Sequence, residues 1–197
     1  MSMVYRFMYQ GYADGPVKPK EDAGAEQIAL AENDGTVFLY YESVIPDLPP
    51  EKAAAGKMKP FPDGSHWQRM PEIFHYSKPL SQEHWRRKIS GKKPEFRMNY
   101  VLPDKVASYI YYHYQYQEEI PGDGDKYGAI FISGNMLMMY LEYPSEPETE
   151  KYAGGLNTHN TPYEQWGEIM NAHFQPWENG KKEWREIKLI QEDTHDI

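Results

Sequence analysis

Four side chains in the second half of this 197-residue chain are of types that recognise or transform small molecules: His113, Tyr127, Trp166 and Tyr109. Histidine changes charge close to neutral pH and therefore suits acid or base chemistry. A tyrosine hydroxyl can hydrogen-bond a sugar hydroxyl, and an indole face can stack on the C–H groups of a sugar. Each also has a structural interpretation, as a core histidine or a packed aromatic ring. Spacing alone leaves both interpretations open.

The segment around His113 is typical of an amphipathic helix. Asp104 stands where an N-cap is expected, and Val106, Tyr109, Ile110 and His113 fall on one helical face. We therefore expect a helix over 104–119 with Tyr109 and His113 on its inward face.

Tyr127 begins a segment with the pattern of a β-hairpin. Residues 127–132 are rich in β-forming types, Ser133-Gly-Asn135 is a turn signal, and residues 136–143 form the predicted returning strand. Tyr127 would then lie at the start of a strand, at the rim of a small barrel.

Trp166 belongs to a second predicted helix. Thr161 and Glu164 have the spacing of a capping box, and Pro162 occupies the first helical position. The apolar face of this helix continues to Phe174. With a strand over 96–102 before the first helix and another over 184–190 at the end, the order becomes βαββαβ. This order predicts the α+β class and a ferredoxin-like fold.

The first half of the chain has the features of a degenerate copy of this unit. A hairpin is predicted over 27–42, turned at Asn33-Asp-Gly35, and 65–74 occupies the place of the second helix. We therefore expect a tandem duplication, with a degenerate half over 1–90 and a complete half over 91–197, packed as a barrel within one chain. The proline-rich segment 46–64 is interpreted as a lid over the surface.

Composition excludes several classes of function. The formal net charge of −9 disfavours a nucleic-acid partner, and the chain contains no cysteine for disulfide or thiolate chemistry. We recognise no signal peptide, no membrane span, no metal-ligand spacing and no cofactor motif. The expectation is a cytoplasmic protein without a membrane partner, metal or cofactor.

The second half also resembles a known family. Residues 103–113, 127–132, 137–142 and 164–170, within a stretch from Phe96 to Gln191, are similar to the L-rhamnose mutarotase family of the dimeric α+β barrel superfamily. Members of this family are small isomerases of carbohydrate metabolism that interconvert the α and β anomers of a sugar. The barrel would here be made within one chain, which leaves a monomer or a homodimer as the expected state.

The resemblance implies roles for individual residues. His113 would be the catalytic acid or base of a metal-free ring opening, while Tyr127, Trp166 and Tyr109 would bind the sugar. The family has a tryptophan pair on the second helix; here Trp166 matches one member and Gly167 replaces the other.

Two alternatives remain open at this stage. The same fold can serve a binding protein that holds a carbohydrate or another small ligand without turning it over. It can also serve a cofactor-free monooxygenase, because the aromatic residues at 109–116 would suit an aromatic substrate.

Overall fold

The computed structural model describes residues 3–20 and 24–190. The end of the predicted second half, from residue 191 onward, lies outside the described residues. The chain divides into an N-terminal unit, made of Met1–Met70, Pro79–Arg86 and Ile187–Ile197, and a C-terminal unit, made of Pro71–Lys78 and Arg87–Glu186.

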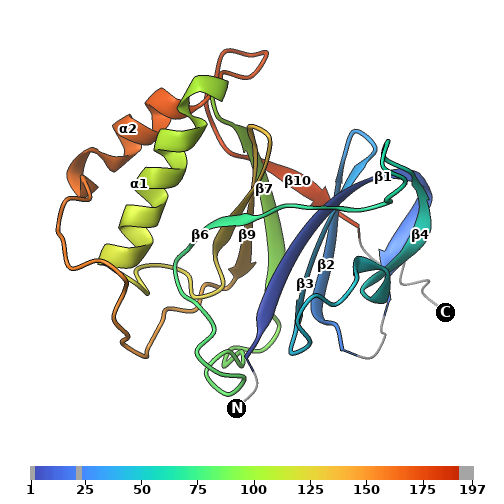
Figure 1. The fold of residues 1–197 in the computed structure, drawn as a ribbon, viewed down its shortest axis with the longest axis horizontal. Coiled ribbons are helices and arrows are strands. Elements are labelled where there is room, and N and C mark those ends of the chain that lie inside the picture. The colour runs from blue at the N-terminus through green and yellow to red at the C-terminus, as the bar shows by residue number, and fades with distance from the viewer. Residues whose placement is uncertain (1–2, 21–23, 191–197) are drawn as a thin grey trace. The chain divides into compact units, whose positions relative to one another are not determined.

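Strands dominate the regular structure (Figure 1). The ten strands of the described residues are β1 (Tyr5–Pro19), β2 (Glu26–Asn33), β3 (Thr36–Ser43), β4 (Ala54–Lys59), β5 (Gln68–Arg69), β6 (Glu72–His75), β7 (Lys93–Tyr100), β8 (Ala129–Ser133), β9 (Met136–Tyr143) and β10 (Arg185–Leu189). The helical elements are α1 (Val106–Glu119), α2 (Trp166–His173) and the 3-10 turns η1 (Pro50–Lys52), η2 (Pro103–Lys105) and η3 (Tyr163–Gln165). Neither α-helix of the described part is long and apolar enough to cross a bilayer.

The N-terminal unit is an antiparallel sheet with the strand order β4-β1-β3-β2-β10, and β5 also pairs with β1. Lys188 and Leu189 of β10 provide the pairs with β2. The predicted turn between β2 and β3 is confirmed: Asp34 and Gly35 both have positive φ, as a two-residue hairpin turn requires. Inward residues of these strands, with Trp67, form the hydrophobic core of the unit.

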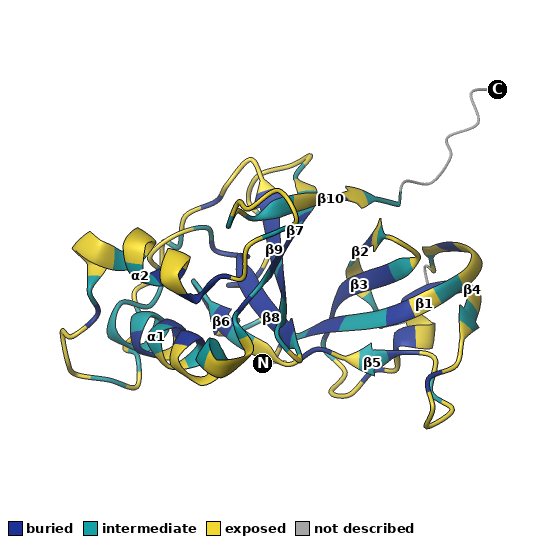
Figure 2. Cartoon of the chain, turned by 90° about the horizontal axis from the view of Figure 1, so that it is seen from above, coloured by how far each residue is buried: buried dark blue, intermediate teal, exposed yellow. Residues whose placement is uncertain are grey.

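The C-terminal unit combines a four-stranded antiparallel sheet, in the order β7-β9-β8-β6, with the two helices. α1 and α2 lie side by side (Figure 1). Tyr109 of α1 and Met170 of α2 pack with Phe74, Ile130 and Leu137 of the sheet into one buried cluster. Burial is accordingly concentrated on β7 to β9 and on the inner sides of the helices (Figure 2).

The prediction of tandem ferredoxin-like βαββαβ units, forming an intrachain barrel of the dimeric α+β type, is wrong. The described residues are mainly β, both α-helices belong to the C-terminal unit, and the N-terminal unit is an antiparallel β-sheet without an α-helix. In addition, β6, which precedes the predicted βαββαβ segment in the chain, pairs with β8.

Two segments of the first half differ from their prediction for a shared reason, which is strand pairing across long sequence separations. Residues 65–74 do not form a counterpart of α2; β5 pairs with β1 and β6 pairs with β8. The segment 46–64 is not a lid, because it contains η1 and β4, and β4 pairs with β1.

Candidate functional site

A cleft of about 420 Å³ opens in the C-terminal unit between the two helices and the sheet. Its volume falls in the range that holds a small molecule. The lining is dominated by aromatic rings and consists of Phe74, Tyr76, Tyr109, His113, Tyr116, Ile130, Met139, Trp166, Gly167, Met170, Asn171, Phe174, Lys182 and Trp184.

His113 lies in this cleft on the inward face of α1, and it is almost fully buried. Its Nδ1 is 2.9 Å from the carbonyl oxygen of Tyr109, one helical turn earlier. Because a carbonyl only accepts, Nδ1 carries the proton, and Nε2 of the neutral ring is an acceptor. Burial lowers the pKa of His113 to about 4; the hydrogen bond to Tyr109 acts in the opposite direction, and the nearby His173 lowers the pKa further.

Aromatic rings surround the imidazole of His113. Its ring centre lies 4.1 Å from that of Tyr109 and 5.0 Å from those of Phe74 and Trp166. Tyr116 extends the wall, with its ring centre 4.9 Å from that of Trp166. Three of the predicted site residues, His113, Trp166 and Tyr109, are therefore brought together in one cleft.

Gly167 leaves the rim of the cleft open beside Trp166. The two residues begin α2, and a Cβ added to Gly167 would meet no atom within 4 Å. The resemblance implies a tryptophan at this position, where this chain has a glycine with space for a Cβ.

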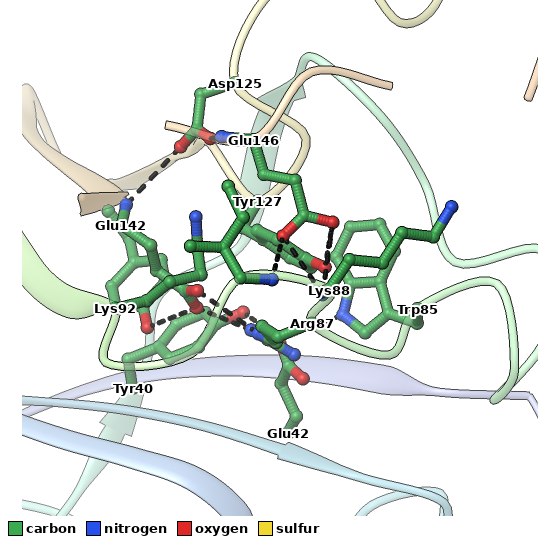
Figure 3. A network of polar contacts seen from close by, with 12 residues as sticks. Tyr40, Glu42, Trp85, Arg87, Lys88, Lys92, Asp125, Tyr127, Glu142 and Glu146 are labelled. Atoms are coloured by element: carbon green, nitrogen blue, oxygen red, sulfur yellow. Dashed lines mark hydrogen bonds and ion pairs between the residues drawn. The ribbon is translucent and has the colours of Figure 1, made fainter. Parts of the chain in front are cut away.

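Tyr127 does not line the cleft. It precedes β8, is fully buried, and packs its ring against cations: the guanidinium carbon of Arg87 lies 4.0 Å from the ring centre and Nζ of Lys92 lies 5.2 Å away. Its hydroxyl donates to Glu146 at 3.4 Å (Figure 3). Tyr127 is thus part of a polar network that holds the loops of the C-terminal unit.

Glu142 is the buried carboxylate of the same network (Figure 3). Arg87 donates to it twice, from Nε to Oε2 at 3.2 Å and from Nη2 to Oε1 at 2.5 Å, and Tyr140 donates at 2.9 Å. These hydrogen bonds give the buried carboxylate of Glu142 charged and polar partners and link Arg87, from the segment before β7, to β9.

The N-terminal unit contains a carboxylate with a similar local pattern. Tyr40 donates to Glu42, two residues further along β3, at 2.7 Å, and Nε1 of Trp85 donates to the same carboxylate oxygen at 2.9 Å (Figure 3). These two hydrogen bonds give the buried carboxylate of Glu42 polar partners, which offsets the cost of removing it from water.

Glu119, at the end of α1, anchors the loop that leads to α2. It accepts hydrogen bonds from Thr158, from the backbone of Asn160 at 2.9 Å, and from both the backbone and the hydroxyl of Thr161. Desolvation acts to raise the pKa of Glu119, but these bonds outweigh it and lower the pKa to about 2. The predicted capping role of Thr161 is therefore wrong, since its hydroxyl serves Glu119.

A second cavity, also of about 420 Å³, lies in the N-terminal unit beside β4. Trp67 and His66 line it, together with Lys20 and Glu51. It has fewer aromatic side chains in its lining than the cleft around His113.

Sequence reasoning missed Phe74, Asn171 and Lys182 as cleft residues. Phe74 comes from β6, which was not expected as a strand, and Lys182 comes from the connection that precedes β10. Asn171 had a usable signal, because it lies four residues after Gly167 and one turn of α2 brings the two to the same face.

Within residues 3–20 and 24–190, no group of three or more histidine, aspartate or glutamate side chains is arranged to hold a metal ion. No protein-family model matches the chain, and neither a curated protein nor a solved structure matches it. The resemblance to the L-rhamnose mutarotase family therefore stays a prediction from the residues quoted above.

Proposed function

We propose that the cleft of the C-terminal unit binds a small ring-shaped molecule, with a monosaccharide as the first candidate. The observation that carries the proposal is the buried, neutral imidazole of His113 within a cleft walled by aromatic rings. Such a site combines flat faces for stacking with an acceptor for a ligand hydroxyl.

The electrostatics of His113 favour binding over proton transfer. An efficient general base has a pKa near the working pH, whereas the pKa of His113 is about 4. At neutral pH the imidazole accepts a hydrogen bond well but takes up a proton poorly.

Mutarotation of the bound sugar is the second candidate function. It is favoured because His113 and Trp166, which the resemblance assigns to catalysis and sugar binding, line the same cleft. In such a reaction the imidazole would take the proton of the anomeric hydroxyl, water would give a proton to the ring oxygen, and the bond between the anomeric carbon and the ring oxygen would break. Both proton transfers would reverse when the ring closes on the other face of the aldehyde. General base catalysis typically contributes about 10²- to 10⁴-fold in rate.

One NMR experiment tests both candidates. Saturation-transfer spectra of the whole chain with L-rhamnose, L-fucose and D-galacturonate report binding, and exchange between anomer signals reports turnover. We expect contact signals that His113→Ala weakens and that His159→Ala, at an exposed loop position, leaves unchanged.

The outcomes separate the two functions. Anomer exchange faster than in buffer, and lost in His113→Ala, would favour the mutarotase. Sugar binding without faster anomer exchange would favour a binding protein over a mutarotase. If none of the three sugars gives a contact signal, the proposed binding of a monosaccharide is wrong.

A further inference from the structure

The charge of the cleft differs from the charge of the chain. The chain carries a formal net charge of −9, yet Lys182 is the one cation among the described lining residues, and no aspartate or glutamate is among them. A ligand in this cleft therefore meets a positive side chain without a competing carboxylate in the wall.

The position of Lys182 is defined by the end of α2. Its Nζ donates to the carbonyl oxygen of Asn171 at 3.3 Å, in the last turn of the helix, where backbone carbonyls carry partial negative charge. An ammonium group has three donors, so a second acceptor can bind beside that carbonyl.

Two carboxylates close to Lys182 in sequence pair with other cations. Glu183 lies 3.9 Å from Nζ of Lys181, and Glu178 lies 2.8 Å from Nη1 of Arg185. These ion pairs engage the two carboxylates with Lys181 and Arg185, whereas Lys182 belongs to the lining of the cleft.

We propose that the ligand of the cleft is a single ring that bears one carboxylate and at least one hydroxyl. This inference rests on the proposed function and narrows its ligand class. The carboxylate would accept from Lys182, the hydroxyl would donate to Nε2 of His113, and the ring would pack on Trp166 and Tyr116. Both a sugar acid and a hydroxylated aromatic acid have this chemistry.

Matched probes test the role of the carboxylate. Calorimetric titration of the whole chain would compare D-galacturonate with D-galacturonamide, and 4-hydroxybenzoate with 4-hydroxybenzamide. We expect the acid of one pair to bind about tenfold more tightly than its amide, as a charge-assisted hydrogen bond at a half-buried site gives. A preference within the galacturonate pair would indicate a sugar ring, and a preference within the hydroxybenzoate pair would indicate an aromatic ring.

Two variants test whether Lys182 causes the preference for the acid over the amide. Lys182→Met should abolish the preference for the acid while the affinity for the amide stays the same. Lys181→Met is the matched control, because Lys181 is the exposed neighbour, is paired with Glu183 and does not line the cleft. We expect this control to retain the preference.

Three results would overturn the inference. Equal binding of acid and amide would refute it while leaving ring binding intact. If Lys182→Met weakens the binding of acid and amide equally, Lys182 contributes to the packing of the site and does not bind the carboxylate. If Lys181→Met also loses the preference for the acid, the preference comes from the overall positive charge of this segment and not from Lys182. If none of the four probes and no neutral sugar binds, the proposed function itself fails.

Discussion

His113 owes its properties to the residues packed around it. Its Nδ1 is occupied by the Tyr109 carbonyl and its ring is enclosed by Phe74 and Trp166, so water reaches it poorly. Removing water disfavours the charged imidazolium, which keeps the ring neutral and leaves Nε2 as an acceptor.

This burial predicts a loss of stability in acid. The pKa of His113 is about 4 in the folded protein and about 6.5 when exposed, so between these values the unfolded chain binds more protons. Above pH 6.5 the protonation of His113 does not reduce the free energy of unfolding. As the pH drops from 6.5 toward 4, protonation of His113 in the unfolded chain lowers the free energy of unfolding by about 3 kcal/mol. Urea unfolding at pH 7, 5.5 and 4.5 measures this change.

The variant His113→Gln removes the titrating group and should flatten the pH dependence in this window. The control His159→Gln replaces an exposed histidine and should keep the slope of the wild type. An unchanged slope in His113→Gln would contradict the lowered pKa of the buried His113.

Sequence periodicity located some site residues and not others. Tyr109 and His113 were predicted on the inward face of their helix because that face depends only on local spacing. The surroundings of Tyr127 were not predictable, because Arg87 and Lys92 reach its ring from a segment about forty residues earlier in the chain.

At the scale of the elements, those that depend on local signals were predicted well. α1 begins two residues after the predicted start and ends at the predicted residue, and the hairpin of β8 and β9 turns at Gly134 as expected. The predicted helix caps were wrong, because neither Asp104 nor Thr161 provides a side-chain cap. Thr161 instead bonds to Glu119, a partner that local spacing cannot indicate.

Two glycines give opposite predictions for the same substitution. Gly167→Ala should stabilise the protein by about 0.5–1 kcal/mol, because alanine favours a helix and its Cβ would meet no neighbour. Gly154→Ala should destabilise it by about 1–3 kcal/mol, since its Cβ would lie 2.0 Å from the carbonyl oxygen of Glu118. Thermal unfolding of both variants, compared with the wild type, measures the two effects. A destabilised Gly167→Ala would mean that this helix start is not formed as described.

On the scale of the whole molecule, the units are not continuous stretches of sequence. Pro71–Lys78 belongs to the C-terminal unit, although Pro79–Arg86, which follows it, belongs to the N-terminal unit. Fold class was mispredicted because the hairpin over 27–42 and the segment 65–74 indicated a degenerate second copy of the βαββαβ unit. Hairpins form by local pairing, whereas the placement of β5 and β6 depends on partners far away in the chain.

The contribution of β6 to the C-terminal unit can be measured through Phe74. Its ring is buried and packs against Tyr76, His113 and Tyr116. Phe74→Ala should lower the free energy of unfolding by about 3–5 kcal/mol, because it removes the ring and leaves a cavity. Urea unfolding provides the measurement.

Tyr111→Ala is the matched control for Phe74→Ala. Tyr111 lies on the outer face of α1 and is 62% exposed, so its removal should change stability by less than about 0.5 kcal/mol. Equal effects of the two substitutions would mean that β6 is not packed into the unit.

The open space beside Gly167 also makes this residue a position for a spectroscopic reporter. The 197 residues contain no cysteine, so Gly167→Cys would introduce a single thiol at the rim of the cleft. A fluorophore or spin label attached there would project into free space instead of the core. Its signal would then follow occupancy of the cleft directly, including for compounds that cause no detectable change in stability.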